Sequence, residues 1–474
     1  MTNEEFRTYA HELVDWMADY LRDVERYPVR PPVAPGDIIG RLPLHPPEEG
    51  EPFETLFADF KTTILPGMTH WQHPSFFGYF PANNSAPSIL AEMLTATMGA
   101  QCMSWATSPA ATELEERVMQ WLGEMTGLPP SFSGVIQDTA STASLCAVLT
   151  AREQKTAFRV NGEGLSRERP FTVYVSGETH SSIERAVKIA GLGASSLRRV
   201  PVDEKFAMIP EELEGAIERD RAQGFEPLCV VATIGTTGST AIDPLGPIGA
   251  VCAQHALWLH VDAAYAGTAL LLPEMRWMID GIAQADSFVF NPHKWMFTNF
   301  DCSAYFVKDA GLLVRTFEIL PEYLKTKERE RVRNHRDWGI QLGRRFRALK
   351  LWFVIRSFGV EGLRERIRSH LAFAQSFARG VEGEPDFELM APVPLAAVCF
   401  RYHPPEVDDP VALDALNSAL LEELNRSGRM FITHTRLNGR LTLRLVASQT
   451  NVTLRHVGAA WDLIRSAARA RSRT

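Results

Sequence analysis

The sequence is poor in cysteine, has no excess of basic residues and contains no long uninterrupted hydrophobic run. Its six cysteines are scattered without a CxxC pair, which is typical of free thiols in a reducing compartment. Lys and Arg total 49 against 57 for Asp and Glu, and the net charge of −8 argues against nucleic-acid or anionic-membrane partners. The longest uncharged stretch, residues 62–91, is broken by prolines and polar residues that a membrane span does not tolerate. We therefore expect a cytoplasmic protein.

Two classes of catalytic site also lack their motifs. No Gly-x-Ser-x-Gly turn is present, which argues against a serine hydrolase. No HExxH or Cys/His cluster with ligand spacing occurs either. The residues that could still be arranged around a metal are His255, His260, Asp262 and His293. Because they lack that spacing, we expect no metal site.

The first 85 residues differ in pattern from the rest of the 474-residue chain. Apolar residues recur every three or four positions over residues 4–24, and Thr2 and Glu5 have the spacing of a capping box, so an amphipathic helix is predicted. Its apolar stripe could pack on the chain's own core or on a partner subunit. Repeated prolines over residues 27–47 separate this helix from the main body.

From about residue 130, short β-branched runs alternate with helical patterns. The predicted strands are 171–176, 197–202, 228–234, 258–261, 287–291 and 304–307, and the predicted helices between them are 142–155, 181–191, 210–222 and 246–255. This alternation predicts an α/β fold with a mostly parallel sheet, whose ligands gather at the carboxyl ends of the strands. A long helical run after residue 340 leads to a smaller α+β domain with strands near 396–402 and 441–446.

Two of the predicted strands end in residues suited to cofactor chemistry. Lys294 follows an apolar strand, where partial desolvation would favour the neutral amine needed for a Schiff base, although a surface lysine is the commoner case. Asp262 ends a second apolar strand and requires a cationic partner, either an arginine or a protonated pyridine nitrogen. Lysine and aspartate together are the polar groups that a pyridoxal phosphate site needs.

Two further segments could complete such a site. The small residues from Ser133 to Thr142 precede a helix whose N-terminus could bind a phosphate, although such residues are usually only N-caps. His180 follows another strand and could stack on a planar ring, or it could be a hydrogen-bonded core residue.

Six motifs in order give the chain a resemblance to a known family. They are His70–Pro81, Ser133–Ser141, His180–Ser182, His260–Gly267, Asn291–Trp295 and Leu342–Arg347. With these motifs the sequence resembles the pyridoxal-phosphate-dependent group II amino acid decarboxylases, and most closely the aromatic-L-amino-acid decarboxylases. The resemblance runs from residue 1 to about 465.

The resemblance implies a fold type I enzyme with a seven-stranded, mostly parallel sheet. Its expected parts are an N-terminal helical dimerisation arm (1–85), a large cofactor-binding α/β domain (86–348) and a small C-terminal α+β domain (349–474). A homodimer with active sites at the subunit interface is also implied, which favours a partner subunit for the first helix. The expected reaction converts Trp, Tyr, Phe or dihydroxyphenylalanine to the arylalkylamine and carbon dioxide.

The resemblance also assigns roles to residues. Lys294 binds the cofactor covalently, Asp262 pairs with its ring nitrogen and His180 stacks on its ring. The remaining cofactor positions are Ala140, Ser141, Thr237, Ser287 and Asn291. Tyr323 stands where the family has a tyrosine on a mobile lid that protonates the α-carbon, and His293 lies near the substrate's carboxylate end together with Thr237.

The resemblance also implies a set of substrate-binding residues, and several of them differ from the residues usual in the family. They are Trp71, Tyr79, Phe80, Pro81, Ala82, Gln101, Met103, Thr237, His293 and Gly343. Gly343 stands where relatives acting on phenolic or imidazole rings often have Ser, which would leave room for a large ring such as indole. Ala82 stands where the family usually has Thr. Gln101 and Met103 stand where the family commonly has apolar and Phe residues, which implies a less aromatic and more polar wall of the pocket, supplied by the neighbouring subunit.

Two other functions remain open at this stage. An aromatic aldehyde synthase would use the same scaffold, although the presence of Tyr323 argues against it, and a pyridoxal-phosphate-binding protein without turnover is the second. Arg444 lies on an apolar strand; facing the cofactor it would favour an aminotransferase, and we expect it to be structural.

Overall fold

The computed structural model describes residues 1–319 and 332–471. The chain forms two compact units, each built from separated segments. Unit 1 comprises Met1–Pro81, Gln375–Met390 and Val398–Thr474, and unit 2 comprises Ala82–Ala374 and Ala391–Ala397. The division into an arm and two domains at residues 85 and 348 remains a prediction.

Unit 2 is built on a seven-stranded sheet in the order β1-β7-β6-β5-β4-β2-β3. Its strands are β1 (Ser133–Gln137), β2 (Phe171–Ser176), β3 (Leu197–Val200), β4 (Glu226–Thr233), β5 (Trp258–Asp262), β6 (Ser287–Phe290) and β7 (Ser303–Val307). β3, β2, β4, β5 and β6 are parallel, whereas β7 is antiparallel to both β6 and β1. The predicted α/β fold with a mostly parallel sheet is therefore confirmed.

One strand was not predicted. Residues 133–137 were expected in a loop before a helix, but they form β1 at the edge of the sheet. The Ser and Gly at its start resemble a loop, and only its pairing with β7, far away in the sequence, makes it a strand. The other six strands lie where β-branched and aromatic residues indicated them.

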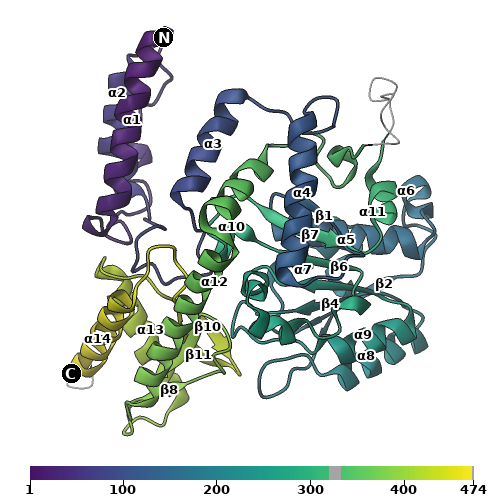
Figure 1. Ribbon diagram of the computed structural model, residues 1–474. Helices are drawn as coiled ribbons and strands as arrows, with labels where there is room; N and C mark the ends of the chain where they lie inside the picture. Colours follow the sequence, from purple (N-terminus) through teal and green to yellow (C-terminus); the bar gives the residue numbers. More distant parts are fainter. Residues whose placement is uncertain (320–331, 472–474) are drawn as a thin grey trace. The chain divides into compact units, whose positions relative to one another are not determined.

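Helices cover the sheet of unit 2. They are α3 (Ala86–Met98), α4 (Pro109–Thr126), α5 (Ala140–Lys155), α6 (Arg159–Glu163), α7 (Ser181–Ile189), α8 (Pro210–Ala222), α9 (Leu245–His255), α10 (Pro292–Trp295) and α11 (Ala310–Phe317). Figure 1 shows α5 against the sheet, and its small residues Ala143 and Ala147 pack with Val289 and Tyr305 in one buried cluster. This packing sets the N-terminus of α5 at the carboxyl end of β1.

Unit 1 contains the predicted first helix, α1 (Asn3–Asp23). Its capping box is confirmed, because the Thr2 hydroxyl accepts the Glu5 N–H and the Glu5 carboxylate accepts the Thr2 N–H. α1 lies beside α2 (Phe53–Asp59; Figure 1), and Trp16 of α1 makes edge contacts with Phe57 and Phe60.

The C-terminal part of unit 1 holds an antiparallel sheet in the order β10-β11-β9-β8. Its elements are β8 (Phe387–Leu389), β9 (Ala397–Tyr402), α13 (Pro410–Arg426), β10 (Thr433–Leu437), β11 (Arg440–Val446) and α14 (Leu454–Arg471). The helical stretch α12 (Arg347–Glu382) runs through both units and is interrupted at Gly359, whose φ of 66° is not helical. Among the described helices, none is long and apolar enough to cross a membrane.

Candidate active site

The carboxyl ends of three neighbouring strands bring most of the predicted cofactor residues to one edge of the sheet. β4, β5 and β6 are parallel, so their carboxyl ends lie side by side. Thr237 lies in the turn after β4, Asp262 is the last residue of β5, and Lys294 lies just after β6.

Lys294 lies in the single turn α10 and is half-buried. Its carbonyl accepts a hydrogen bond of 2.6 Å from the Asn83 side-chain amide, and the Asn83 N–H donates to the carbonyl of His293 at 3.1 Å. Asn83 is itself buried, so these two bonds hold the backbone that carries the lysine. No local pattern indicates a role for Asn83, because its partners lie more than 200 residues away in the sequence.

Asp262 is almost completely buried, and its Oδ1 accepts the Ala264 N–H at 3.0 Å. Within the described residues, no arginine forms an ion pair with it, so the alternative explanation for this carboxylate finds no support. Its negative charge instead acts on His180, which also feels the positive charge of Lys294. The three predicted residues therefore lie within electrostatic range of one another.

The ring of His180 is held by the helix that follows it. His180 is the N-cap of α7, and its Nδ1 accepts the Ser182 N–H at 3.1 Å and lies 2.9 Å from the Ser182 hydroxyl. Partial desolvation and the Lys294 charge lower its pKa, although the Asp262 carboxylate opposes them. The histidine is therefore neutral at pH 7, with its hydrogen on Nε2. Its side chain remains exposed, which excludes a core role.

The predicted phosphate cradle is the first turn of α5. Ala140 and Ser141 open this 16-residue helix, and Thr139 is its N-cap. Just before the cap, Asp138 accepts the Thr139 N–H at 2.6 Å and the side-chain amide of Gln341 at 2.7 Å. A helix N-terminus presents unpaired N–H groups and a positive dipole end, which suit a phosphate.

His293 and Asn291 lie in the same turn as Lys294. His293 is buried, and its Nδ1 accepts the Cys302 N–H at 2.9 Å, which leaves the ring hydrogen on Nε2. Burial, together with the positive charges of Lys294 and Lys350, lowers its pKa to about 3. Asn291 caps α10, and its side-chain oxygen accepts the Ser303 hydroxyl at 2.6 Å.

Ser287 is the one predicted cofactor residue that the structure does not bring to this edge. It begins β6, three residues before the strand ends. Its hydroxyl is completely buried and accepts the indole N–H of Trp258 at 2.9 Å. The Nδ1 of His260 lies 2.9 Å from the same hydroxyl, and Nε2 of that histidine lies 3.1 Å from Ser144. Ser287 thus belongs to a buried polar network between the sheet and α5.

Thr237 is the exposed residue of a turn whose other residues are mostly buried and hold it in place. Gly235, at a φ of 78°, donates its N–H to the Ala241 carbonyl at 2.8 Å, a conformation that favours glycine. Asp243 then closes the turn by accepting the N–H groups of Thr233 and Met208, each at 2.7 Å. Burial raises the pKa of Asp243 to about 6. The residues around Asp243 in the sequence do not indicate that its carboxylate is buried.

Three predicted substrate residues come together in unit 2. Gln101 accepts the Arg344 N–H on its side-chain oxygen at 2.7 Å, which sets it beside Gly343. Two residues along, the Met103 carbonyl accepts the Arg336 N–H at 2.9 Å. Ala82 belongs to the same unit.

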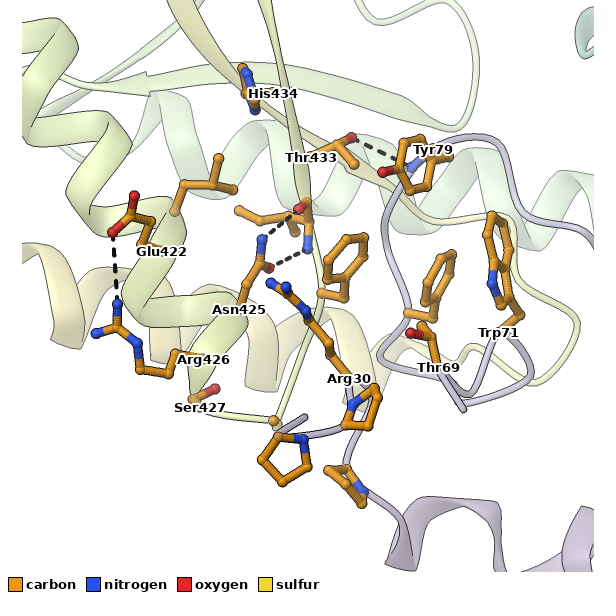
Figure 2. Close-up of a pocket in the computed structure, with 18 of the residues that line it drawn as sticks. Arg30, Thr69, Trp71, Tyr79, Glu422, Asn425, Arg426, Ser427, Thr433 and His434 are labelled. Atoms are coloured by element: carbon orange, nitrogen blue, oxygen red, sulfur yellow. Dashed lines mark hydrogen bonds and ion pairs between the residues drawn. The ribbon is translucent and has the colours of Figure 1, made fainter. Parts of the chain in front are cut away.

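The other predicted substrate residues, Trp71, Tyr79, Phe80 and Pro81, belong to unit 1. Trp71 is stacked on Tyr79 with ring centroids 5.8 Å apart, and both line a cavity of about 1030 Å³ (Figure 2). The guanidinium of Arg444 lies 4.8 Å from the centroid of the Phe80 ring, so Arg444 packs against an aromatic side chain. Tyr323 and the rest of the expected lid lie largely outside the described residues.

The groups that meet at this edge of the sheet fit pyridoxal phosphate. A lysine amine, a buried carboxylate, an imidazole ring and a helix N-terminus suit its aldehyde, pyridine nitrogen, ring face and phosphate respectively. Over residues 1–319 and 332–471, no three His, Cys, Asp or Glu side chains are grouped so that they could hold a metal ion.

Known proteins are similar to this chain over nearly its full length. The chain is 42% identical to an aromatic-L-amino-acid decarboxylase of Sus scrofa, over 99% of this chain and 97% of that protein. It is 41% identical to a phenylacetaldehyde synthase of Arabidopsis thaliana, over 99% of this chain and 96% of that protein.

A solved structure and a family model extend these similarities to the fold. The crystal structure of Oryza sativa TDC with PLP and tryptamine superposes with a TM-score of 0.96 at 36% identity, covering 99% of each chain. The family model described as "Pyridoxal-dependent decarboxylase conserved domain" matches residues 35–403. The chain therefore belongs to the pyridoxal-dependent decarboxylase family.

Proposed function

We propose that this protein is a carboxy-lyase that converts aromatic L-amino acids to arylalkylamines and carbon dioxide. The observation that carries the proposal is the grouping of Lys294, Asp262 and His180 at one sheet edge, in a chain of this family. Pyridoxal phosphate, when bound there, supplies an aldehyde for the substrate amine and a ring that accepts the electrons left by carbon dioxide.

Each residue at the edge has a distinct task toward this cofactor. The Lys294 amine would attach the cofactor, and the Asp262 carboxylate would pair with its ring nitrogen. His180, whose orientation is set by Ser182, would stack on its ring. Ala140 and Ser141 would bind its phosphate through the first turn of α5.

The substrate carboxylate is handled by neutral groups, His293 and Thr237. With a pKa of about 3, His293 offers an Nε2–H donor without a positive charge at pH 7. A strong ion pair at this position would stabilise the starting carboxylate and oppose its loss. A neutral donor orients the carboxylate while leaving its departure favourable, which supports decarboxylation over transamination.

Tyr323, which lies outside the described residues, is the proposed donor of the proton that replaces carbon dioxide on the α-carbon. Within unit 2, the substrate's ring is bound by Ala82, Gln101, Met103 and Gly343.

The functional unit is a homodimer with active sites at the subunit interface. α1 contains no buried residue, and Phe6 and Val14 on it are 60% and 42% exposed. A helix with an uncovered apolar stripe gains stability when a second copy buries that stripe. The six cysteines are all free and buried, which suits a reducing, cytoplasmic location.

The direct test is an assay of purified protein with pyridoxal phosphate and a panel of amino acids. Trp, Tyr, Phe, dihydroxyphenylalanine, His, Glu and Asp are supplied separately, and carbon dioxide, amine, aldehyde and keto acid are measured. We expect carbon dioxide and amine in equal amounts from the aromatic substrates only. Carbon dioxide from none of them would refute the proposal.

The second candidate is an aromatic aldehyde synthase, favoured by the 41% identity to phenylacetaldehyde synthase. That reaction consumes oxygen and water and yields the aldehyde, carbon dioxide, ammonia and hydrogen peroxide. The same assay separates the two, because only the synthase produces peroxide in proportion to carbon dioxide. The presence of Tyr323, as the α-carbon proton donor, favours the amine.

A further inference from the structure

The side-chain amide of Gln101 lies over Gly343 in a fixed orientation. Its oxygen accepts the Arg344 N–H at 2.7 Å, and only the oxygen of the amide can accept this bond. Nε2 is therefore the end near Gly343, where it lies 3.2 Å from the position that a Cβ would take. The amide thus fills part of the space that the glycine was expected to leave for a large ring.

A buried ion pair holds the backbone to which Gln101 is bonded. Arg344 donates to both carboxylate oxygens of Glu115, at 3.1 and 2.8 Å, and both side chains are buried. Glu115 also accepts the Ile136 N–H at 2.9 Å, which ties the pair to β1. In return, the Arg344 carbonyl accepts the N–H of Cys102, the residue after Gln101, at 2.9 Å. The orientation of the amide therefore depends on a rigid support.

The Nε2 of Gln101 has hydrogens to donate. Across the part of the chain that the structure describes, neither of its N–H groups meets an acceptor, and both Gln101 and Gly343 are exposed. The segment that carries Gly343 is joined to the cofactor edge, because Gln341 donates to Asp138 just before α5. The N–H groups of Gln101, held beside Gly343, are therefore available to a polar group on the substrate's ring.

We propose that Gln101 is a specificity-determining residue that donates a hydrogen bond to a ring hydroxyl of the substrate. This inference rests on the proposed function and narrows its substrate class to phenolic and catecholic amino acids, Tyr and dihydroxyphenylalanine, over Phe. A site that hydrogen-bonds a substrate hydroxyl discriminates against the analogue that lacks it, because the donor then stays unpaired. For one neutral hydrogen bond at a partly solvated site, the expected preference in kcat/KM is roughly three- to tenfold.

The test compares kcat/KM for Tyr and Phe in the holoenzyme and two variants of Gln101. Gln101→Met keeps the length of the side chain but removes the donor and the acceptor. Gln101→Glu keeps an acceptor for the Arg344 N–H and replaces the donor by a negatively charged oxygen, which can accept a hydrogen bond from a phenol hydroxyl but cannot donate one. The ratio of the two substrates is the readout, because a loosened wall raises KM for both and leaves the ratio unchanged. Gln120→Met, on the exposed face of α4, is the matched control.

We expect the wild type and the control to prefer Tyr, and Gln101→Met to bring the ratio close to one. Gln101→Glu, with its wall bonded as in the wild type, should retain a preference for Tyr because its carboxylate accepts from the phenol hydroxyl. A wild-type ratio of one or less, or an unchanged ratio in Gln101→Met, would overturn the inference while leaving the decarboxylase function intact. Absence of carbon dioxide from every aromatic substrate would instead refute the proposed function, and the inference would be rejected with it.

Discussion

Replacing Glu115 by Gln should destabilise the protein by about 3 kcal/mol. Burial alone would raise the pKa of this carboxyl, but Arg344, His335 and the Ile136 N–H lower it from 4.5 to about 2. At about 1.4 kcal/mol per pH unit, that difference is worth about 3 kcal/mol for the charged form. The value agrees with the cost of about 3–5 kcal/mol for leaving one member of a buried ion pair alone.

The expected change in melting temperature follows from the size of the protein. An unfolding entropy of about 2.1 cal/mol/K per residue gives about 1 kcal/mol/K for 474 residues, so the variant should melt about 3 °C lower. Glu116→Gln is the matched control, since Glu116 is next in the sequence and its carboxylate lies 3.7 Å from Arg333 in a partly exposed pair. A pair of that kind contributes about 1 kcal/mol or less.

The pH dependence of the difference in stability between wild type and Glu115→Gln provides a second check. Because the folded pKa of Glu115 is below its unfolded value, its stabilisation is complete well above pH 4.5 and is lost as pH falls toward 2. The gap between wild type and Glu115→Gln should therefore fall from about 3 kcal/mol at pH 7 to about 1 kcal/mol at pH 3. Calorimetry at both pH values measures it. A melting temperature within 1 °C of wild type at pH 7 would refute the reasoning.

Three further predictions concern Lys294, Tyr323 and His293. Lys294→Ala should lose the visible absorption of the covalently held cofactor, whereas the exposed Lys188→Ala should keep it; a persisting band would place the attachment elsewhere. Tyr323→Phe should shift product from amine toward aldehyde and peroxide, as measured by chromatography, and an unchanged amine yield would reject its role as proton donor. Since the pKa of His293 is about 3, it is already neutral at pH 5, so kcat/KM for His293→Gln and wild type should differ by the same factor at pH 5 and pH 8.

The sequence predicted those parts of the fold that depend on local pattern. Six strands of the large sheet and the capping box of α1 follow from apolar runs and short-range spacing. β1 was missed, because its assignment depends on pairing with β7, 170 residues away. Lys294 and Asp262 were found because each is a charged residue at the end of an apolar strand.

The supporting residues could not be predicted in the same way. Asn83, Asp243 and Glu115 each hold backbone groups that are distant in the sequence or belong to another element. Nothing in their local sequence distinguishes them from surface polar residues. Ser287 shows the opposite problem, since the resemblance to the family implied a cofactor contact, whereas its hydroxyl is buried with Trp258 and His260.

The arginines next to the site also bear on the choice between decarboxylation and transamination. Arg344 is paired with Glu115, and Arg347 donates to Asp301 at 2.8 and 3.3 Å. Both guanidiniums are buried and committed to carboxylates of the protein. Recruiting Arg344 as a clamp for a substrate carboxylate would leave the buried Glu115 unpaired, and recruiting Arg347 would leave the half-buried Asp301 unpaired. That penalty of several kcal/mol leaves neutral donors such as His293 to orient the carboxylate. Because the substrate carboxylate is then bound without a full positive charge, it is not stabilised against leaving as carbon dioxide.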